Sequence, residues 1–177
     1  PGINRFISGQ KIYARKNVQI VIDIKKKMEL DAQSTTIKVD FSPDATIYDV
    51  FNKFTEQFNV NRTEQDVSAF DTCARALNYI PGVILKFTVW LLKLLDYFGL
   101  LPKFLINLSP FHGSMFITSM GSLGIPPIYH HLYDFGNIPV FIAFGKKTSR
   151  LSLTREGNVV EKKYIDFSIV TDERICD

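Results

Sequence analysis

The chain has 177 residues, of which 46% are hydrophobic and 22% are charged, and its formal net charge is +3. This length predicts a single domain with a substantial core, and the composition is that of an ordinary globular protein. The basic residues are scattered apart from residues 25–27, which argues against the clustered positive face of a nucleic-acid-binding protein. Cys73 and Cys176 match neither a disulfide framework nor a metal site, so a reducing, cytoplasmic setting is expected.

Three β-strands are predicted within the first forty or so residues. Residues 11–15 are a short candidate, and residues 18–24 and 35–41 alternate apolar with polar side chains. Residues 1–10 show no helix or strand pattern and are predicted to be turn-like. We therefore expect a sheet to start close to the beginning of the chain.

Helices are predicted to follow these strands. Thr46 and Asp49 approximate a capping box, and the apolar residues after them have helical spacing, so this amphipathic helix is expected to cover the sheet. Residues 67–77 show the same spacing. After a break at Pro81, residues 83–98 form a longer, more apolar helix. A surface this apolar indicates either a deep core or a contact between subunits.

Residues 79–108 are the one candidate for a membrane-spanning segment. A spanning helix needs ~20 mostly apolar residues. This stretch is interrupted by Lys86, Lys93, Asp96 and Lys103. A buried or interfacial helix is therefore favoured over a spanning one, and a helix lying on a membrane surface stays a weaker alternative.

Residues 113–145 are predicted to form two strands joined by a long loop, an arrangement that often builds binding surfaces. Residues 150–154 are a further short strand, and residues 159–170 a long one. The long strand contains three alternating residues expected in the core, Ile165, Phe167 and Ile169. Strands, then helices, then strands predict a mixed α/β sandwich with non-sequential strand pairing.

The loop contains His130, His131 and Asp134, which suggest a histidine base beside an orienting carboxylate. However, the loop is rich in residues that favour turns, and neighbouring histidines in an extended chain cannot both face one site. Histidines without a catalytic role are therefore the favoured interpretation. His112 offers still less indication of function.

Four hydroxyl side chains surround the glycine turn that begins this loop, namely Ser114, Thr118, Ser119 and Ser122. One of them could donate a hydrogen bond to a developing oxyanion, although such residues are also common in turns for conformational reasons. The sequence contains no phosphate-binding loop, zinc-ligand spacing or dinucleotide fingerprint. The residues alone leave the function open.

Three segments resemble the catalytic domain of the dihydrolipoamide acyltransferases, which shares its fold with chloramphenicol acetyltransferase. Residues 116–125, FITSMGSLGI, resemble the family's F-T-I-S-N-L-G-x-x-G-I strand and turn. Residues 137–145 resemble its N-P-P…A-I-L-A-x-G strand, and residues 172–177, DERICD, resemble its D-H-R-x-x-D-G signature up to the glycine. The resemblance implies a chloramphenicol acetyltransferase-like α+β fold, a two-layer sandwich with a mixed sheet covered by helices. It also implies that residues 1–177 are one partial domain, without the family's first and last helix and strand.

In this family the signature histidine takes a proton from the thiol of coenzyme A or dihydrolipoamide, and a Ser or Thr hydroxyl stabilises the oxyanion. The site lies between neighbouring subunits of a trimer. Carried over by residue, Ser119 matches the hydroxyl, Thr118 is the alternative, and Asp177 matches the structural aspartate. The resemblance thus implies a homotrimeric acyltransferase that uses acyl-coenzyme A without a metal, with a lipoyl-type acyl carrier as a candidate partner.

Glu173 stands where the family has its catalytic histidine. A carboxyl group of pKa ~4.3 is about four units less basic than a thiol of pKa ~8.5, so proton transfer to it is unfavourable by roughly 5 to 6 kcal/mol. Burial can raise a carboxyl pKa by several units and recover much of this difference. Two hypotheses follow: an acyltransferase with Glu173 as an unusual base, and a non-catalytic trimeric scaffold or acyl-coenzyme A-binding regulator with the same fold.

Overall fold

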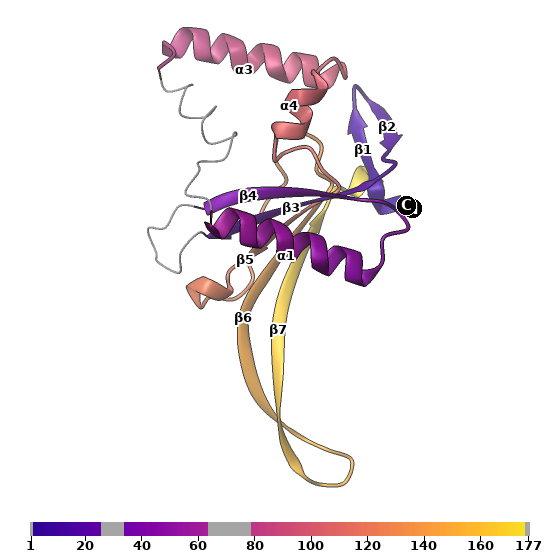
Figure 1. The fold of residues 1–177 in the computed structure, drawn as a ribbon, viewed down its shortest axis with the longest axis vertical. Helices are drawn as coiled ribbons and strands as arrows, with labels where there is room; N and C mark the ends of the chain where they lie inside the picture. Colours follow the sequence, from indigo (N-terminus) through magenta and orange to yellow (C-terminus); the bar gives the residue numbers. More distant parts are fainter. Residues whose placement is uncertain (1, 26–33, 64–78, 176–177) are drawn as a thin grey trace.

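The computed structural model describes residues 2–25, 34–63 and 79–175, and Figure 1 shows their arrangement. The strands are β1 (Arg5–Ser8), β2 (Lys11–Ala14), β3 (Val18–Lys25), β4 (Ser34–Phe41), β5 (Met115–Ser119), β6 (Val140–Leu153) and β7 (Val159–Thr171). The α-helices are α1 (Ile47–Thr63), α3 (Gly82–Tyr97) and α4 (Lys103–Leu108). Short 3-10 turns form η1 (Gly2–Asn4), η2 (Gly121–Leu123) and η3 (Glu173–Ile175).

Five strands form one mixed sheet in the order β4-β3-β5-β6-β7. β5 runs parallel to both β3 and β6, whereas the outer pairs β3–β4 and β6–β7 are antiparallel. β6 and β7 continue beyond the other strands as a long curved hairpin, as Figure 1 shows. The mixed sheet with non-sequential pairing that the sequence predicts is therefore confirmed.

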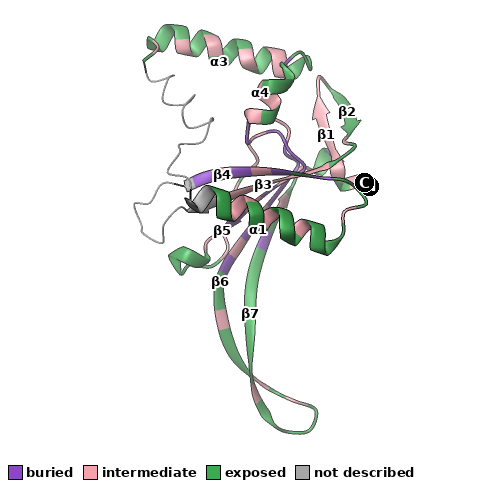
Figure 2. Ribbon diagram, in the orientation of Figure 1, coloured by how far each residue is buried: buried purple, intermediate pink, exposed green. Residues whose placement is uncertain are grey.

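Each face of the sheet carries its own apolar cluster. On one face the buried residues are Val21, Phe116, Ile138, Phe141 and Ala143. The second cluster, Ile37, Val39 and Phe41, is covered by Val50, Phe54 and Phe58 of α1. Figure 2 shows the buried residues gathered where the strands cross, with exposed residues along the hairpin and α3. The predicted role of α1 as a cover for the sheet is thus confirmed.

The loop of residues 124–139 covers the first cluster and is fixed to the sheet at both ends. Lys146 donates its backbone N–H to the Ile125 carbonyl at 3.0 Å, and Asn137 donates to the Phe111 carbonyl at 2.9 Å. Between these points, the Ser168 hydroxyl donates to the carbonyl of Ile128. The loop between β5 and β6 is therefore held as a packed layer over the sheet.

Two glycines allow this close packing. A Cβ at Gly145 would lie 2.5 Å from Cδ of Pro127, which crosses directly over it. Gly136 has a φ of +89°, and a Cβ there would lie 2.1 Å from the Phe111 carbonyl oxygen. A left-handed backbone conformation and a backbone approach this close both require a residue without a Cβ.

The start of the chain differs from its prediction. Residues 5–8 were expected to be turn-like, but they form β1 and pair with β2 as a hairpin. The connecting residues Gly9 and Gln10 both have positive φ, of 53° and 65°, which is the backbone of a tight type I′ turn. The Gly-Gln pair lacks the Asn-Gly or Asp-Gly signal that normally marks this turn, so the hairpin was missed.

The end of the chain differs in two ways. Residues 150–154 were predicted as a separate strand, but β6 runs without a break to Leu153. Ile165, Phe167 and Ile169 were predicted in the core, and their exposed fractions are 54%, 58% and 48%. They alternate as expected, but the neighbouring Ser168 is the buried residue, at 4% exposed. The predicted face is therefore wrong, because the covering loop packs on the opposite side of β7.

The apolar helix α3 has no buried residue, so of the two alternatives for its apolar surface the deep core is excluded within one copy of the chain. Whether it contacts another subunit stays a prediction. Among the described residues, no helix is both long and apolar enough to cross a membrane. The helix predicted over residues 67–77 and both cysteines lie outside the described residues.

The predicted capping box at the start of α1 is confirmed and can be tested. The Thr46 backbone N–H donates to Oδ2 of Asp49 at 2.8 Å, and the Asp49 N–H donates back to Oγ1 of Thr46 at 3.3 Å. Thr46→Val removes the hydroxyl while keeping the shape of the side chain. We expect it to lower the free energy of unfolding by about 1 kcal/mol in urea denaturation.

The matched control is Thr55→Val on the same helix, where the hydroxyl bonds only to the carbonyl of Phe51 one turn earlier. That bond adds little to helix stability. Equal losses in the two variants would mean that the capping box does not contribute.

Candidate functional site

The two hydroxyl candidates lie at the carboxyl end of β5 in different environments. Thr118 pairs with Ala143 and is 7% exposed. Ser119 is exposed, and its Oγ accepts a hydrogen bond from the Gly121 backbone N–H at 3.3 Å. Ser119, the first choice from the resemblance, is therefore the hydroxyl that a substrate can reach.

Glu173 lies at the end of β7 as the first residue of η3. The turn is fixed by Asp172, whose backbone N–H donates to the Pro139 carbonyl at 2.8 Å. The Asp172 carboxylate accepts bonds from Nε of Arg174 at 2.8 Å and from Nη2 at 2.7 Å. Ile175 is buried and anchors the turn from below, while the side chain of Glu173 is exposed. Asp177 lies outside the described residues.

One copy of the chain does not bring Ser119 and Glu173 together. Ser119 pairs with Phe144, whereas Thr171 pairs with Val140, four residues earlier on β6. At about 3.3 Å per residue, this register separates the two ends by about 13 Å along the strands. The distance leaves open the arrangement between subunits that the resemblance implies.

Glu173 lines a cavity of about 380 Å³ between the hairpin of β1, the loop over the sheet and the end of β7. This volume is within the range of small-molecule sites. The polar and charged side chains among its lining residues are His131, Tyr133, Asn137, Thr171, Asp172, Glu173 and Arg174. Phe6 and Ile7 of β1 supply part of the apolar wall. The base position from the sequence signature therefore borders a half-open cavity large enough for a small molecule.

A second cavity, of about 400 Å³, adjoins the first. The two share Ile7, Gly136, Asn137 and Arg174 as lining residues. The second cavity also contains side chains of both charges, Lys93, Asp96, Asp134 and Arg174. Together the two cavities form a neighbouring pair that could hold an extended, partly charged ligand.

Two features of this site were missed by reasoning from the sequence. The first is the wall supplied by β1, in a segment predicted to be turn-like. The second is His131, set aside as a loop histidine, which lines the same cavity as Glu173. No spacing rule connects residues 131 and 173, because only the fold brings the loop and the end of β7 together.

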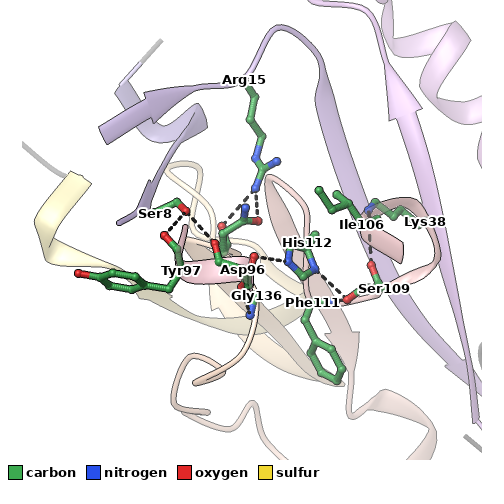
Figure 3. Close-up of polar contacts among 11 residues, drawn as sticks. Ser8, Arg15, Lys38, Asp96, Tyr97, Ile106, Ser109, Phe111, His112 and Gly136 are labelled. Atoms are coloured by element: carbon green, nitrogen blue, oxygen red, sulfur yellow. Dashed lines mark hydrogen bonds and ion pairs between the residues drawn. The ribbon is translucent and has the colours of Figure 1, made fainter. Parts of the chain in front are cut away.

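The buried side chain of His112 joins segments beside the second cavity, and Figure 3 shows its polar contacts. His112 has no exposed surface, and its Nδ1 lies 2.8 Å from Oγ of Ser109. Its Nε2 lies 3.0 Å from Oδ1 of Asp96, near the end of α3. Oδ2 of the same carboxylate accepts the Gly136 N–H at 3.2 Å. His112 therefore connects α3 to the loop. This structural role agrees with the sequence analysis, which found little indication of function for His112.

Two buried cations hold the surrounding segments. Nη2 of Arg15 donates to the Asn137 carbonyl at 3.2 Å and to its side-chain oxygen, and burial lowers the pKa of Arg15 to about 10. Nζ of Lys38 donates to the carbonyl of Ile106 at 2.8 Å, and burial lowers the pKa of Lys38 to about 8. Arg15 thus holds Asn137 at the cavities, and Lys38 holds the end of α4.

The described residues contain no group of three or more His, Cys, Asp or Glu side chains that could hold a metal ion.

No protein-family model matches the sequence, and no curated protein matches it significantly. Solved structures do match. The whole chain aligns with a probable dihydrolipoamide acetyltransferase from Listeria monocytogenes 4b F2365, with a TM-score of 0.56 and 14% identity, over 56% of that chain. It aligns with the dihydrolipoamide acetyltransferase of Azotobacter vinelandii at a TM-score of 0.55. It also aligns with a structure of the cubic core of the pyruvate dehydrogenase multienzyme complex at a TM-score of 0.54. For the Azotobacter and cubic-core structures the sequence identity is 11%, and the alignment covers 55% of the matched chain.

These similarities establish the fold. The chloramphenicol acetyltransferase-like arrangement predicted from the three motifs is confirmed by the shared architecture of the dihydrolipoamide acetyltransferases. Identities of 11 to 14% carry no information about individual site residues. The chain spans little more than half the length of the structures it matches.

The contacts of His112 predict a clear stability difference. His112→Phe keeps an aromatic ring but leaves Asp96 and Ser109 without their partner. We expect the free energy of unfolding to fall by about 2 kcal/mol, because a half-buried carboxylate loses a hydrogen bond. Urea denaturation measures this loss, and the same substitution at the exposed His131 serves as the control. A loss no larger than that of His131→Phe would contradict the buried contact.

The Asp172–Arg174 pair predicts a pH dependence of stability. The side-chain hydrogen bond from Arg174 lowers the pKa of Asp172, so the folded state binds this proton less tightly than the unfolded state. The stabilisation is fully present above the ordinary carboxyl pKa of about 3.9 and is lost as the pH falls through the folded pKa. The difference in unfolding free energy between wild type and Asp172→Asn should therefore shrink below about pH 4.

Denaturation at a series of pH values from about 6 to about 3 measures this difference. Asp166→Asn is the control, because the Arg150–Asp166 pair is exposed and its atoms are 3.6 Å apart. A difference for Asp172→Asn that is constant over this range would show that the pair is not formed in solution.

Proposed function

We propose that this protein transfers an acyl group between coenzyme A and an acceptor thiol or hydroxyl, at the cavity bordered by Glu173. One observation carries the proposal: a chain that aligns over its whole length with dihydrolipoamide acetyltransferases has a cavity of about 380 Å³ where the signature resemblance locates the base. Shared fold alone does not imply shared chemistry. The coincidence of the signature with the cavity is what favours an active site.

The proposed roles follow the resemblance. The Azotobacter enzyme was investigated for the roles of a serine, a histidine and an asparagine in its catalytic mechanism. In this chain, Ser119 is proposed as the oxyanion donor, Glu173 as the group in the base position and Asp177 as the structural aspartate. The exposure of the Ser119 hydroxyl supports this assignment, because an oxyanion donor must reach the substrate.

The adjoining cavity suits the charged part of coenzyme A. Lys93 and Arg174 line it and can neutralise phosphate oxygens, whereas the Glu173 cavity is proposed to take the acyl thioester. The separation of about 13 Å between the Ser119 and Glu173 strand ends supports a homotrimer in which neighbouring copies complete each site. A lipoyl-type carrier is the proposed acyl acceptor.

A second candidate is a non-catalytic trimeric scaffold or acyl-coenzyme A-binding regulator. The observation that favours it is the position of Glu173, which is exposed. Burial is the effect that makes a carboxylate a stronger base. The two candidates differ in one measurement, because the scaffold binds acyl-coenzyme A without turning it over.

The proposed function predicts that the full-length protein binds acetyl-coenzyme A and transfers the acetyl group to dihydrolipoamide. Glu173→Gln should lower kcat by at least about 100-fold, the usual contribution of a group that assists proton transfer. Calorimetry measures binding, and thioester formation measures transfer. Glu161→Gln, an exposed residue on β7, is the matched control.

The outcomes separate the candidates. Binding of acetyl-coenzyme A without acetyl transfer would support the scaffold and contradict the enzymatic proposal. Absence of both binding and transfer would contradict both candidates. Transfer that is unchanged in Glu173→Gln would remove Glu173 from the mechanism while leaving the activity in place.

A further inference from the structure

The proposed function leaves its proton acceptor unexplained. A carboxylate of ordinary pKa is about 10,000-fold too weak a base for a thiol, whereas an imidazole of pKa about 6.5 is only about 100-fold too weak. A histidine within the Glu173 cavity would therefore remove most of the mismatch. The structure provides one such histidine, because His131 lines this cavity together with Glu173.

The backbone and neighbours of His131 hold it in place. The ring of His130 stacks on His131 with centroids 4.8 Å apart, and it stacks at the same distance on Phe141, which is 3% exposed. Leu132 and Tyr133, which follow His131, pack against the apolar cluster on this face of the sheet. His130 therefore acts as a packed support, while the ring of His131 remains exposed at the cavity.

The ring nitrogens of His131 are available. Within the part of the chain that the structure describes, no group forms a hydrogen bond to either of them. This contrasts with His112, whose two nitrogens are both engaged in the interior. A proton acceptor needs a free ring nitrogen that faces the substrate. Of His112 and His131, only His131 offers one.

The other titratable groups around the cavity are committed or unsuited. Asp172 accepts both side-chain bonds from Arg174, and Arg174 keeps its proton. Burial and the charge of Asp23 raise the pKa of Tyr133, so its phenol stays neutral. His131 and Glu173 are left as the two cavity residues available to act on a substrate proton.

We infer that His131 is the proton acceptor for the substrate thiol and that Glu173, which makes no hydrogen bond to it in this structure, is a positioning residue that accepts an N–H bond from the imidazole once substrate occupies the cavity. The inference rests on the proposed function and changes the role of Glu173 within it. A base oriented by a carboxylate is a general arrangement for activating a nucleophile. Here the two members come from the loop between β5 and β6 and from the end of β7.

The reaction step is balanced without any further reactant. The S–H bond of the acceptor thiol breaks as its proton moves to a ring nitrogen of His131, and the thiolate forms a C–S bond to the acyl carbonyl carbon. The C–S bond of the donor thioester then breaks. The imidazolium returns the proton to the departing thiolate, which regenerates neutral His131.

The test uses acetyl transfer from acetyl-coenzyme A to dihydrolipoamide by the full-length protein. His131→Ala should lower kcat by about 100-fold or more with a much smaller change in KM, and added imidazole should restore part of the rate. Tyr129→Phe, an exposed substitution in the same loop, should leave both parameters unchanged.

The failures are distinguishable. Transfer by wild type that is unchanged in His131→Ala would overturn the inference while keeping the proposed function. If wild type transfers nothing, the proposed function fails. A double-mutant cycle on kcat tests the pair directly: Glu173→Gln should slow transfer in the wild-type protein and have no further effect in His131→Ala. Equal effects of Glu173→Gln in the two backgrounds would overturn the pairing.

Discussion

The contact between His112 and Asp96 determines how the remaining parts of the site are arranged. One carboxylate receives the His112 ring through one oxygen and the Gly136 backbone through the other. The same region of α3 is held from outside by Ser8, whose hydroxyl donates to the Asp96 and Tyr97 carbonyls at 3.0 and 3.2 Å. A helix end, a small hairpin and a loop, distant in the sequence, therefore meet at Asp96. The second cavity is bounded by all three segments, and the Glu173 cavity by the hairpin and the loop.

The loop over the sheet links this interior contact to the candidate chemistry. It is closed by backbone bonds at both ends, and its centre is packed on Phe116 and Phe141 through Tyr133 and His130. Such a loop has little freedom, which is what a binding site needs when its polar groups must keep a fixed geometry. The site thus depends on a loop that behaves as part of the core.

The sequence predicted those parts of the fold that local patterns encode. Alternation identified β3, β4 and β7, and a capping box located the start of α1. The β1 hairpin and the face of β7 that is buried were missed, because they depend on an unusual turn pair and on where a distant loop packs. The same limit applied to the site. The signature located Glu173, but the proximity of His131 is a product of tertiary packing that no spacing reveals.

The long hairpin of β6 and β7 has a consequence for self-association. Beyond Phe144, β6 has no neighbouring strand on its outer side in the described residues, and β7 is an edge strand of the described sheet. Unpaired strand edges invite pairing with other chains, and lysines are a common protection against it. Lys146, Lys147, Lys162 and Lys163 lie along these arms and keep the edges hydrated. A chain that adds a strand at these edges must neutralise the lysine charge, so strand pairing at the hairpin is selective for the partner.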